Sequence, residues 1–217
     1  MQALTLSLVM GTGVLLGLGN PLARLASADG LHVLAFTLWP TAVAGLLLAS
    51  IGLARHGAIG VGQRLARFGL VAGAFGHALP MLAAYWLAAH AGAGFASLSF
   101  TLTPVLTLAI MALLGRERLR PVRLTAVGLG MAGGLLLVGG QVWSLQLDAT
   151  FIAVALLVPT SIAATNVYRG LHMPRDLPDA WLSAATLVGS ALLLAVLAPM
   201  VQNGTVRLTD RDGAVWL

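Results

Sequence analysis

The fold is decided by residues 95–140, FASLSFTLTPVLTLAIMALLGRERLRPVRLTAVGLGMAGGLLLVGG. No charged residue occurs from Phe95 to Gly115, and a helix of this length measures about 31 Å, which matches the roughly 30 Å hydrocarbon core of a bilayer. From Val122 to Gly140 the one charged residue is Arg123, near the start. Because only a short turn separates the two apolar stretches, the pattern predicts an antiparallel pair of membrane-spanning helices.

The turn between these two helices is rich in arginine and predicts the orientation of the chain. It contains Arg116, Glu117, Arg118, Arg120 and Arg123. Short loops with excess positive charge stay on the cytoplasmic side. With every predicted loop assigned, nine arginines fall on this side (55, 64, 67, 116, 118, 120, 123, 169 and 175) and three on the other (24, 207 and 211). We therefore expect a multi-pass protein of a prokaryotic plasma membrane, with its N-terminus in the cytoplasm.

The composition is that of an integral membrane protein. Hydrophobic residues make up 59% of the chain and charged residues 9%, whereas soluble domains carry roughly 25% charged residues. All basic residues other than histidine are arginines, mostly in predicted turns, which indicates a role in topology and contact with anionic lipid and not nucleic-acid binding. The sequence has no cysteine, no HExxH motif and no GxSxG motif. We expect no enzyme activity, no cofactor and no metal site.

Five further apolar stretches predict additional membrane-spanning helices. They lie at about residues 4–25, 31–54, 68–90, 149–168 and 180–201. Pro174 and Pro178 mark the turn between the last two. Together with the central pair, these stretches predict an all-α, polytopic fold of about seven transmembrane helices.

The central pair of helices also carries a family pattern. The pattern is a helix opening with Ala96, Ser97 and Leu98, a central Pro104, a helix end with Gly115, Glu117 and Leu119, and a following helix with Gly128, Gly133 and Gly139. It resembles the EamA domain of permeases of the drug/metabolite transporter superfamily. The resemblance implies a carrier of about ten helices, built from two similar halves of opposite topology.

A fixed offset of 146 residues relates the start of the chain to its end. It pairs Asn20 with Asn166, and an odd number of spans separates the copies, so they are inverted with respect to each other. We expect a first repeat of five helices over residues 1–140 and a second repeat of two helices over residues 149–217. Since 217 − 146 is 71, the second copy ends opposite Val71 and is expected to be truncated.

Prolines near the middle of the predicted spans are expected to break their helices. Each proline removes a backbone donor and leaves one carbonyl for a neighbouring group or water to satisfy. Several such breaks together indicate a wet cavity within the membrane. The helix-break candidates are Pro21, Pro40, Pro80, Pro104 and Pro159.

His77 is the one ionisable residue near the centre of a predicted span. Ionisable groups inside a membrane are functional candidates, although a histidine bonded to a backbone carbonyl explains the same position. Hydroxyl residues have a similar alternative, which is a bond to their own helix backbone. We expect the solute path to be lined by Asn20, Trp39, His77, Tyr85, Trp86, Ser97, Thr101 and Asn166.

These features favour a secondary membrane transporter that exports or exchanges a small metabolite or drug-like solute. Its partners are the lipid bilayer and the solute, and protons and a second copy of the chain, as a homodimer, are further candidates. In a proton-coupled carrier, His77 is the expected protonation site. The alternative is a non-transporting membrane fragment, or a subunit that packs through its glycine faces in a larger assembly.

Overall fold

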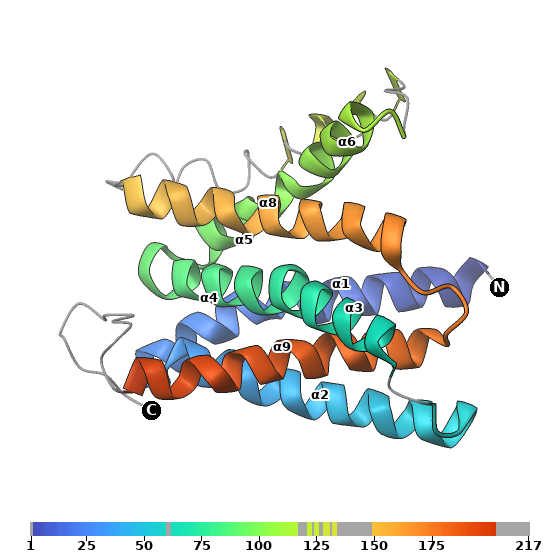
Figure 1. The fold of residues 1–217 in the computed structure, drawn as a ribbon. Helices are drawn as coiled ribbons and strands as arrows, with labels where there is room; N and C mark the ends of the chain where they lie inside the picture. The colour runs from blue at the N-terminus through green and yellow to red at the C-terminus, as the bar shows by residue number, and fades with distance from the viewer. Residues whose placement is uncertain are drawn as a thin grey trace.

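The structure is a computed structural model of the 217-residue chain. It describes residues 2–59, 62–116 and 149–202, together with 121–122, 124–125, 128–130 and 132–133. Within these ranges all regular structure is helical and no strand occurs, which confirms the predicted all-α class (Figure 1). Most of the predicted span 122–140, most of the arginine-rich turn and the residues after 202 lie outside the described residues. The division into repeats at 1–140 and 149–217 stays a prediction.

Short connections join consecutive helices from α1 to α6, and another joins α8 to α9. Their bounds are α1 (Gln2–Ala28), α2 (Val33–His56), α3 (Gln63–Gly73), η1 (Ala74–Ala78, a π-helical turn), α4 (Leu79–Ala91), α5 (Ala93–Thr101), α6 (Thr103–Leu113), α8 (Ala149–His172) and α9 (Asp179–Gln202). Five stretches of the described chain are long and apolar enough to cross a membrane: Val33–His56, Gln63–Ala91, Ala93–Leu113, Ala149–His172 and Asp179–Pro199. The 27-residue helix α1 occupies the place of the first predicted span.

Two helices extend past the apolar stretches that predicted them. Helix α3 begins at Gln63, so Arg64 and Arg67 lie in its first turns and not in a loop. Helix α8 continues to His172, four residues beyond the predicted end of its span. Apolar residues mark only the part of a helix inside the hydrocarbon, whereas the backbone bonds of a helix continue into the interface. Arg169 is therefore a helical residue.

The third span is continuous but changes form just before Pro80. The N–H of Leu79 bonds to the carbonyl of Ala74, which closes the wider ring of a π turn. In this register the Phe75 carbonyl would next accept from residue 80, but proline has no N–H. The hydroxyl of Ser161 on α8 donates to the Phe75 carbonyl instead. Pro80 thus couples the π turn to α8.

The fourth predicted span is divided at Leu102, just before Pro104. Pro104 cannot donate to the Phe100 carbonyl, which instead accepts from the N–H of Leu102. Helices α5 and α6 are the two halves. Of the other predicted break positions, Pro21, Pro40 and Pro159 lie inside α1, α2 and α8, which continue through them as helices.

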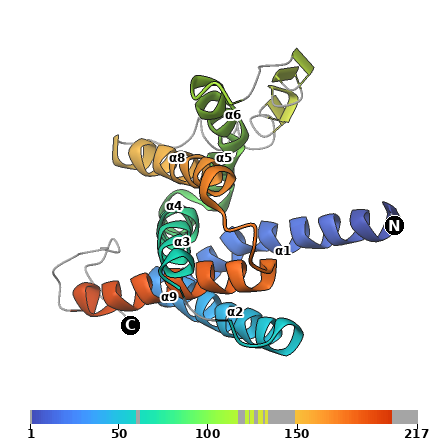
Figure 2. The same ribbon diagram turned by 45° about the vertical axis from the view of Figure 1, so that its right-hand side comes forward.

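The helices form two groups joined by the third span. Helix α9 packs between α2 and α3, whereas α8 packs against α4, α5 and α6 (Figures 1 and 2). Helix α1 packs against α4 and α5, and its N-terminal half extends away from the other helices (Figure 2). The third span, α3 through α4, therefore contacts helices from both ends of the sequence.

Glycines set the distance between α3 and α9. A Cβ built on Gly69 would lie 2.6 Å from the carbonyl oxygen of Ala185, and one on Gly73 would lie 2.6 Å from the backbone nitrogen of Ser190. Real Cβ atoms essentially never approach so closely, so these backbones touch only because the residues are glycine. By contrast, Gly13 and Gly17 on α1 have open space at the Cβ position.

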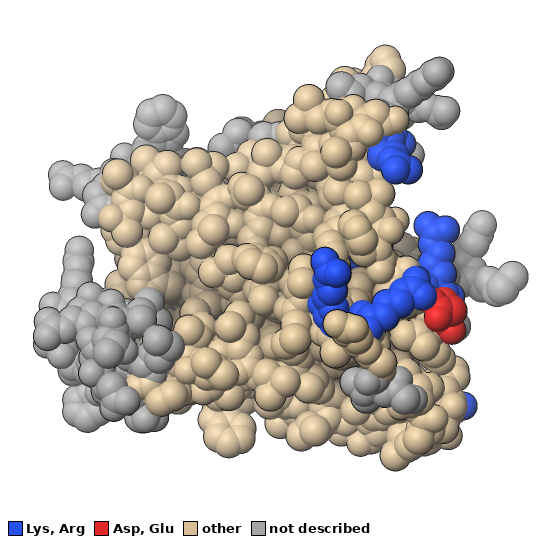
Figure 3. Space-filling model, viewed as in Figure 1, with Lys and Arg blue, Asp and Glu red and all other residues tan. Residues whose placement is uncertain are grey.

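Charge gathers at one end of the described structure. Figure 3 shows arginine side chains (blue) gathered toward the right of this face, near the start of α3, the α8–α9 connection and the end of α6, with acidic atoms (red) beside them, and the rest of the described surface on this face is uncharged. Large apolar side chains face outward along the helices, including Leu16 at 74% exposure. This distribution suits a helical bundle whose apolar sides meet lipid and whose arginines lie at one membrane surface.

Candidate functional site

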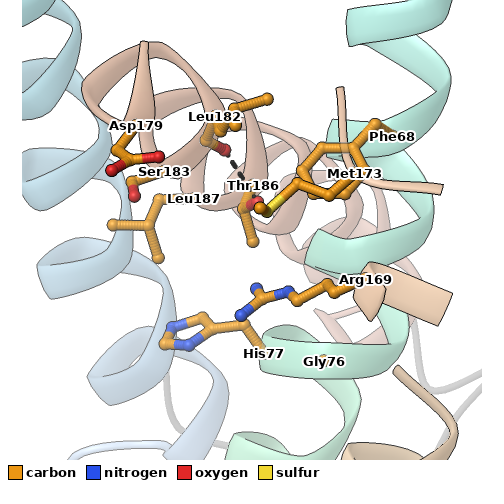
Figure 4. A pocket seen from close by; sticks show the side chains of 10 residues that line it. All are labelled: Phe68, Gly76, His77, Arg169, Met173, Asp179, Leu182, Ser183, Thr186 and Leu187. Carbon is orange, nitrogen blue, oxygen red and sulfur yellow. Dashed lines mark hydrogen bonds between the residues drawn. The ribbon is translucent and has the colours of Figure 1, made fainter. Parts of the chain in front are cut away.

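A cavity of about 390 Å³ lies between the π turn and the ends of α8 and α9 that meet at their connection. Its wall combines segments far apart in the sequence (Figure 4). It is lined by Phe68, Gly76, His77, Arg169, Met173, Asp179, Leu182, Ser183, Thr186 and Leu187. We call it the inner cavity.

His77 lies in the π turn and is held by a hydrogen-bond chain from α2. Its Nε2 lies 3.1 Å from Oγ1 of Thr41, and that hydroxyl donates to the carbonyl of Thr37 at 2.7 Å. A hydroxyl has a single proton, and Thr41 gives it to Thr37, so Nε2 of His77 carries the hydrogen of the bond between them. In the neutral imidazole, Nδ1 is then the basic nitrogen.

Gly76 allows the π turn to approach α8 closely. A Cβ at this position would lie 2.5 Å from the Cγ2 of Thr165. The Thr165 hydroxyl donates to the carbonyl of Ser161 at 2.9 Å, so its methyl group is directed toward the glycine. The π turn is therefore fixed on α8 at the depth of His77. Single π turns inside α-helices are frequent at functional sites.

Arg169 extends into the inner cavity from α8. Figure 4 shows its guanidinium group beside the imidazole of His77. Its Nε is buried and, among the described residues, has no hydrogen-bond partner. The ion pair of the described residues joins Arg64 to Asp176 at 3.1 Å, so it does not include Arg169. The permanent charge of this arginine thus faces the cavity without a carboxylate partner in the described part of the chain.

Asp179 is the acidic residue of the cavity wall, and it lies at the rim. It is exposed in the first turn of α9, a position where the helix dipole favours a carboxylate. In Figure 4 it lies with Ser183 on the side of the cavity opposite Arg169. The inner cavity is therefore cationic at depth and carries one carboxylate at its edge.

A second cavity of about 590 Å³ adjoins the first, and we call it the vestibule. Phe68 and Met173 line both cavities. Phe68 also stacks on Tyr168, with ring centroids 6.0 Å apart. The remaining vestibule residues are Gln63, Arg64, Arg67, Leu171 and His172. Phe68 and Met173 are thus the side chains that separate a basic vestibule from the inner cavity.

Of the predicted path residues, the structure brings His77 to the inner cavity and distributes the others. Trp39 is 68% exposed on the outside of α2. Tyr85 makes an edge-on contact with Phe36 at 5.1 Å between ring centroids. Trp86 stacks on His90 and Phe151 on another side of α4. Thr101 donates to the backbone carbonyl of Leu98 at 2.7 Å. Its hydroxyl therefore bonds to the backbone of its own helix, which is the alternative to lining the solute path.

The two asparagines related by the 146-residue offset make matching contacts. Asn20 donates to Oγ of Ser97 at 3.0 Å, and Asn166 lies 3.5 Å from Oγ1 of Thr107. Ser97 lies on α5 and Thr107 on α6, each five residues from the break at Leu102. Each asparagine therefore contacts one half of the divided span. The inverted repeat itself stays a prediction.

Arg169 was not among the site residues predicted from the sequence. The span was predicted to end at residue 168, so Arg169 was counted as a loop charge that sets topology. A usable signal was present, because Arg169 lies within one helical turn of Asn166 and precedes the helix-ending Pro174 by five residues. Phe68, Met173 and Thr186 gave no such signal, because apolar and hydroxyl residues are common on every span.

Comparisons with known proteins identify the family. The family model for EamA-like transporters matches residues 3–139, which is more than half of the chain. The comparisons with curated proteins and with solved structures gave no match. The match covers α1 to α6, including the π turn and His77. The chain therefore belongs to the EamA-like transporter family, part of the drug/metabolite transporter superfamily.

Proposed function

We propose that this protein is a secondary carrier that exports or exchanges a small metabolite or drug-like solute across the plasma membrane, and that the solute binds in the inner cavity. The observation that carries the proposal is the composition of the cavity wall. His77 comes from the segment that the family model matches, whereas Arg169 and Ser183 come from α8 and α9. Carriers built from repeats bind their solutes between the two halves.

The size and depth of the inner cavity suit a small solute. Its volume of about 390 Å³ falls in the range of roughly 300–1,000 Å³ typical of small-molecule sites. His77 is 14 residues from the start of α3 at Gln63, or about 21 Å along the helix. A solute beside His77 would therefore lie well inside the membrane, as alternating access requires.

The bonds around the cavity also support a site that changes shape. The π turn has one carbonyl satisfied by a side chain of α8, and the fourth span is divided at Leu102. Interrupted helices whose carbonyls are satisfied by neighbours are the form that irregular backbone takes around transport cavities. Movement of α8 against the third span would open or close the inner cavity, since α8 carries Arg169.

Counterflow in proteoliposomes tests the proposal. Vesicles loaded with an unlabelled mixture of organic acids, amino acids and sugars would be given the same solutes in labelled form. The Ser183→Trp variant fills the inner cavity, and Ser50→Trp is the matched control because Ser50 is exposed on α2 and does not line this cavity. We expect exchange of at least one solute by the wild type and Ser50→Trp and its loss in Ser183→Trp. Absence of exchange by the wild type would favour the non-transporting alternative.

A further inference from the structure

We infer that the solute carries an anionic group, a carboxylate or a phosphate, and that Arg169 binds this group in the inner cavity. The inference rests on the proposed transport function and adds the chemical class of the solute. It is carried by three observations, which are the unpaired guanidinium, its place beside His77 and the basic vestibule next to the cavity.

The guanidinium of Arg169 has no ion-pair partner among the described residues, and a ligand could supply the missing negative charge. Arg169 is half-buried, and its Nε is fully buried. An arginine stays protonated in proteins, so the cost of this partial burial cannot be relieved by loss of the proton. Charges withdrawn from water are normally paired, and within the described residues Arg169 makes neither an ion pair nor a bond at Nε. The planar fork of a guanidinium matches two oxygens of one carboxylate or phosphate. An anion bound there would complete the pairing.

The surroundings of Arg169 favour an anion over a cation. His77 lies beside it and bonds to Thr41 through its Nε2–H. An imidazole is neutral or positively charged, so it cannot balance the charge of the arginine. Ser183 and Thr186 add hydroxyl groups to the wall. Asp179 is the opposing charge, but it is exposed at the rim, where water and salt screen it. A cation bound beside Arg169 would be repelled by the arginine charge, and the one carboxylate among the described wall residues is that of Asp179 at the rim.

The vestibule extends the same preference toward the membrane surface. Arg64 is paired with Asp176, whereas no ion pair of Arg67 occurs within the described residues. Positive-inside topology explains why arginines lie at this end. Clefts lined by one sign of charge concentrate ions of the opposite sign. The vestibule arginines should therefore raise the local concentration of anions next to the inner cavity, with which the vestibule shares Phe68 and Met173.

Anion binding by the full chain in nanodiscs of neutral phosphatidylcholine tests the inference. The probes are sodium phosphate and sodium succinate, with glucose as the neutral control and choline as the cationic control, at constant ionic strength. Binding is followed by calorimetry and by the thermal unfolding midpoint. We expect phosphate or succinate to bind and Arg169→Gln to weaken that binding at least tenfold. Arg169→Lys keeps the charge without the fork and should fall between the two.

Arg175→Gln is the matched control, because Arg175 is an exposed arginine of the α8–α9 connection that lines neither cavity. It should bind anions within twofold of the wild type. Equal loss in both glutamine variants would overturn the inference, because bulk charge would then explain the binding. Circular dichroism confirms that each variant keeps its helix content, and Arg169→Lys keeps the test valid if Arg169→Gln does not fold.

Three further outcomes separate the inference from the proposed function. Binding of glucose or choline that Arg169→Gln does not change would overturn the anionic class but leave transport in place. Arg169-dependent protection by phosphatidylglycerol in the discs, without binding of soluble anions, would assign the site to a lipid headgroup and overturn the inference. Arg169-dependent binding of phosphate or succinate without counterflow of any solute would support the binding site and contradict the transport function.

Discussion

Replacing Gly73 by alanine should weaken the contact between α3 and α9. The new Cβ would lie 2.6 Å from the backbone nitrogen of Ser190 and close to the carbonyl oxygen of Thr186. Ordinary contact begins at 3.4 Å, so the two backbones must move apart by at least 0.8 Å, the difference between 2.6 and 3.4 Å, and the closer Thr186 oxygen requires more. Neither neighbour is a flexible side chain that could turn aside. The nearby contacts of Gly69 and Gly189 would loosen with it.

The expected loss of stability follows from this geometry. Overpacking a well-packed interface costs about 1–3 kcal/mol, and a clash between backbones belongs at the upper end, about 3 kcal/mol. For a chain of this size, that corresponds to a fall of roughly 6–12 °C in the unfolding midpoint. The midpoint can be measured in detergent by tryptophan fluorescence, since the chain has five tryptophans.

Gly17→Ala is the control for Gly73→Ala. It makes the same chemical change within α1, where no atom lies within 4 Å of the new Cβ. Because alanine is the better helix former by about 1 kcal/mol, this variant should be as stable as the wild type or more so. An unfolding midpoint of Gly73→Ala within about 1 °C of the wild type would refute the close approach of α3 and α9.

Three further predictions concern single side chains. Ser161→Ala leaves the Phe75 carbonyl without its donor and should cost about 1–3 kcal/mol in unfolding experiments, whereas Ser161→Thr should keep most of the stability. In a proton-coupled carrier, His77→Gln should abolish flux driven by an imposed pH gradient while solute exchange persists, and unchanged gradient-driven flux would assign His77 to packing. Burial lowers the pKa of His32, which precedes the first residue of α2 and accepts a bond from the N–H of Leu34. The unfolded chain then binds the proton more readily than the folded chain does. The contribution of His32 to folded stability should therefore be fully present above about pH 6.5 and fall as the pH drops through that value toward the lower folded pKa. His32→Asn should remove this pH dependence.

The spans could be predicted because hydrocarbon imposes a simple rule on the sequence. Apolar stretches of about 20 residues can only be buried helices or membrane spans, so the first helix of the central pair and the stretches around Pro40 and Thr186 were identified from composition alone. The rule says little about where each helix ends. Helix α8 continues to His172, and the charge of Arg169 was therefore assigned to a loop.

The site was harder to predict because it depends on which face of each helix meets a neighbour. His77 was identified, since an ionisable residue at mid-span is costly unless it has a partner. Trp39 is equally distinctive in the sequence, yet it lies 68% exposed on α2. Likewise, proline removes a donor wherever it occurs, but of the five predicted break positions only Pro80 and Pro104 coincide with a change of helix form. Contacts across 80 or more residues, such as Ser161 with Phe75, decide these outcomes.

A single-cysteine experiment tests whether the inner cavity is a solute site that opens toward the arginine-rich side of the membrane, which is predicted to be cytoplasmic. The chain has no cysteine, so Ser183→Cys places one thiol on the cavity wall, and Leu31→Cys places one at the opposite end of the bundle. A membrane-impermeant thiol reagent would be applied to right-side-out and inside-out vesicles, with and without succinate. We expect the thiol at position 183 to react in inside-out vesicles, succinate to slow this reaction, and the thiol at position 31 to react in right-side-out vesicles. Reaction of position 183 only from the outside, or a rate that succinate does not change, would contradict the assignment of this cavity as a solute site.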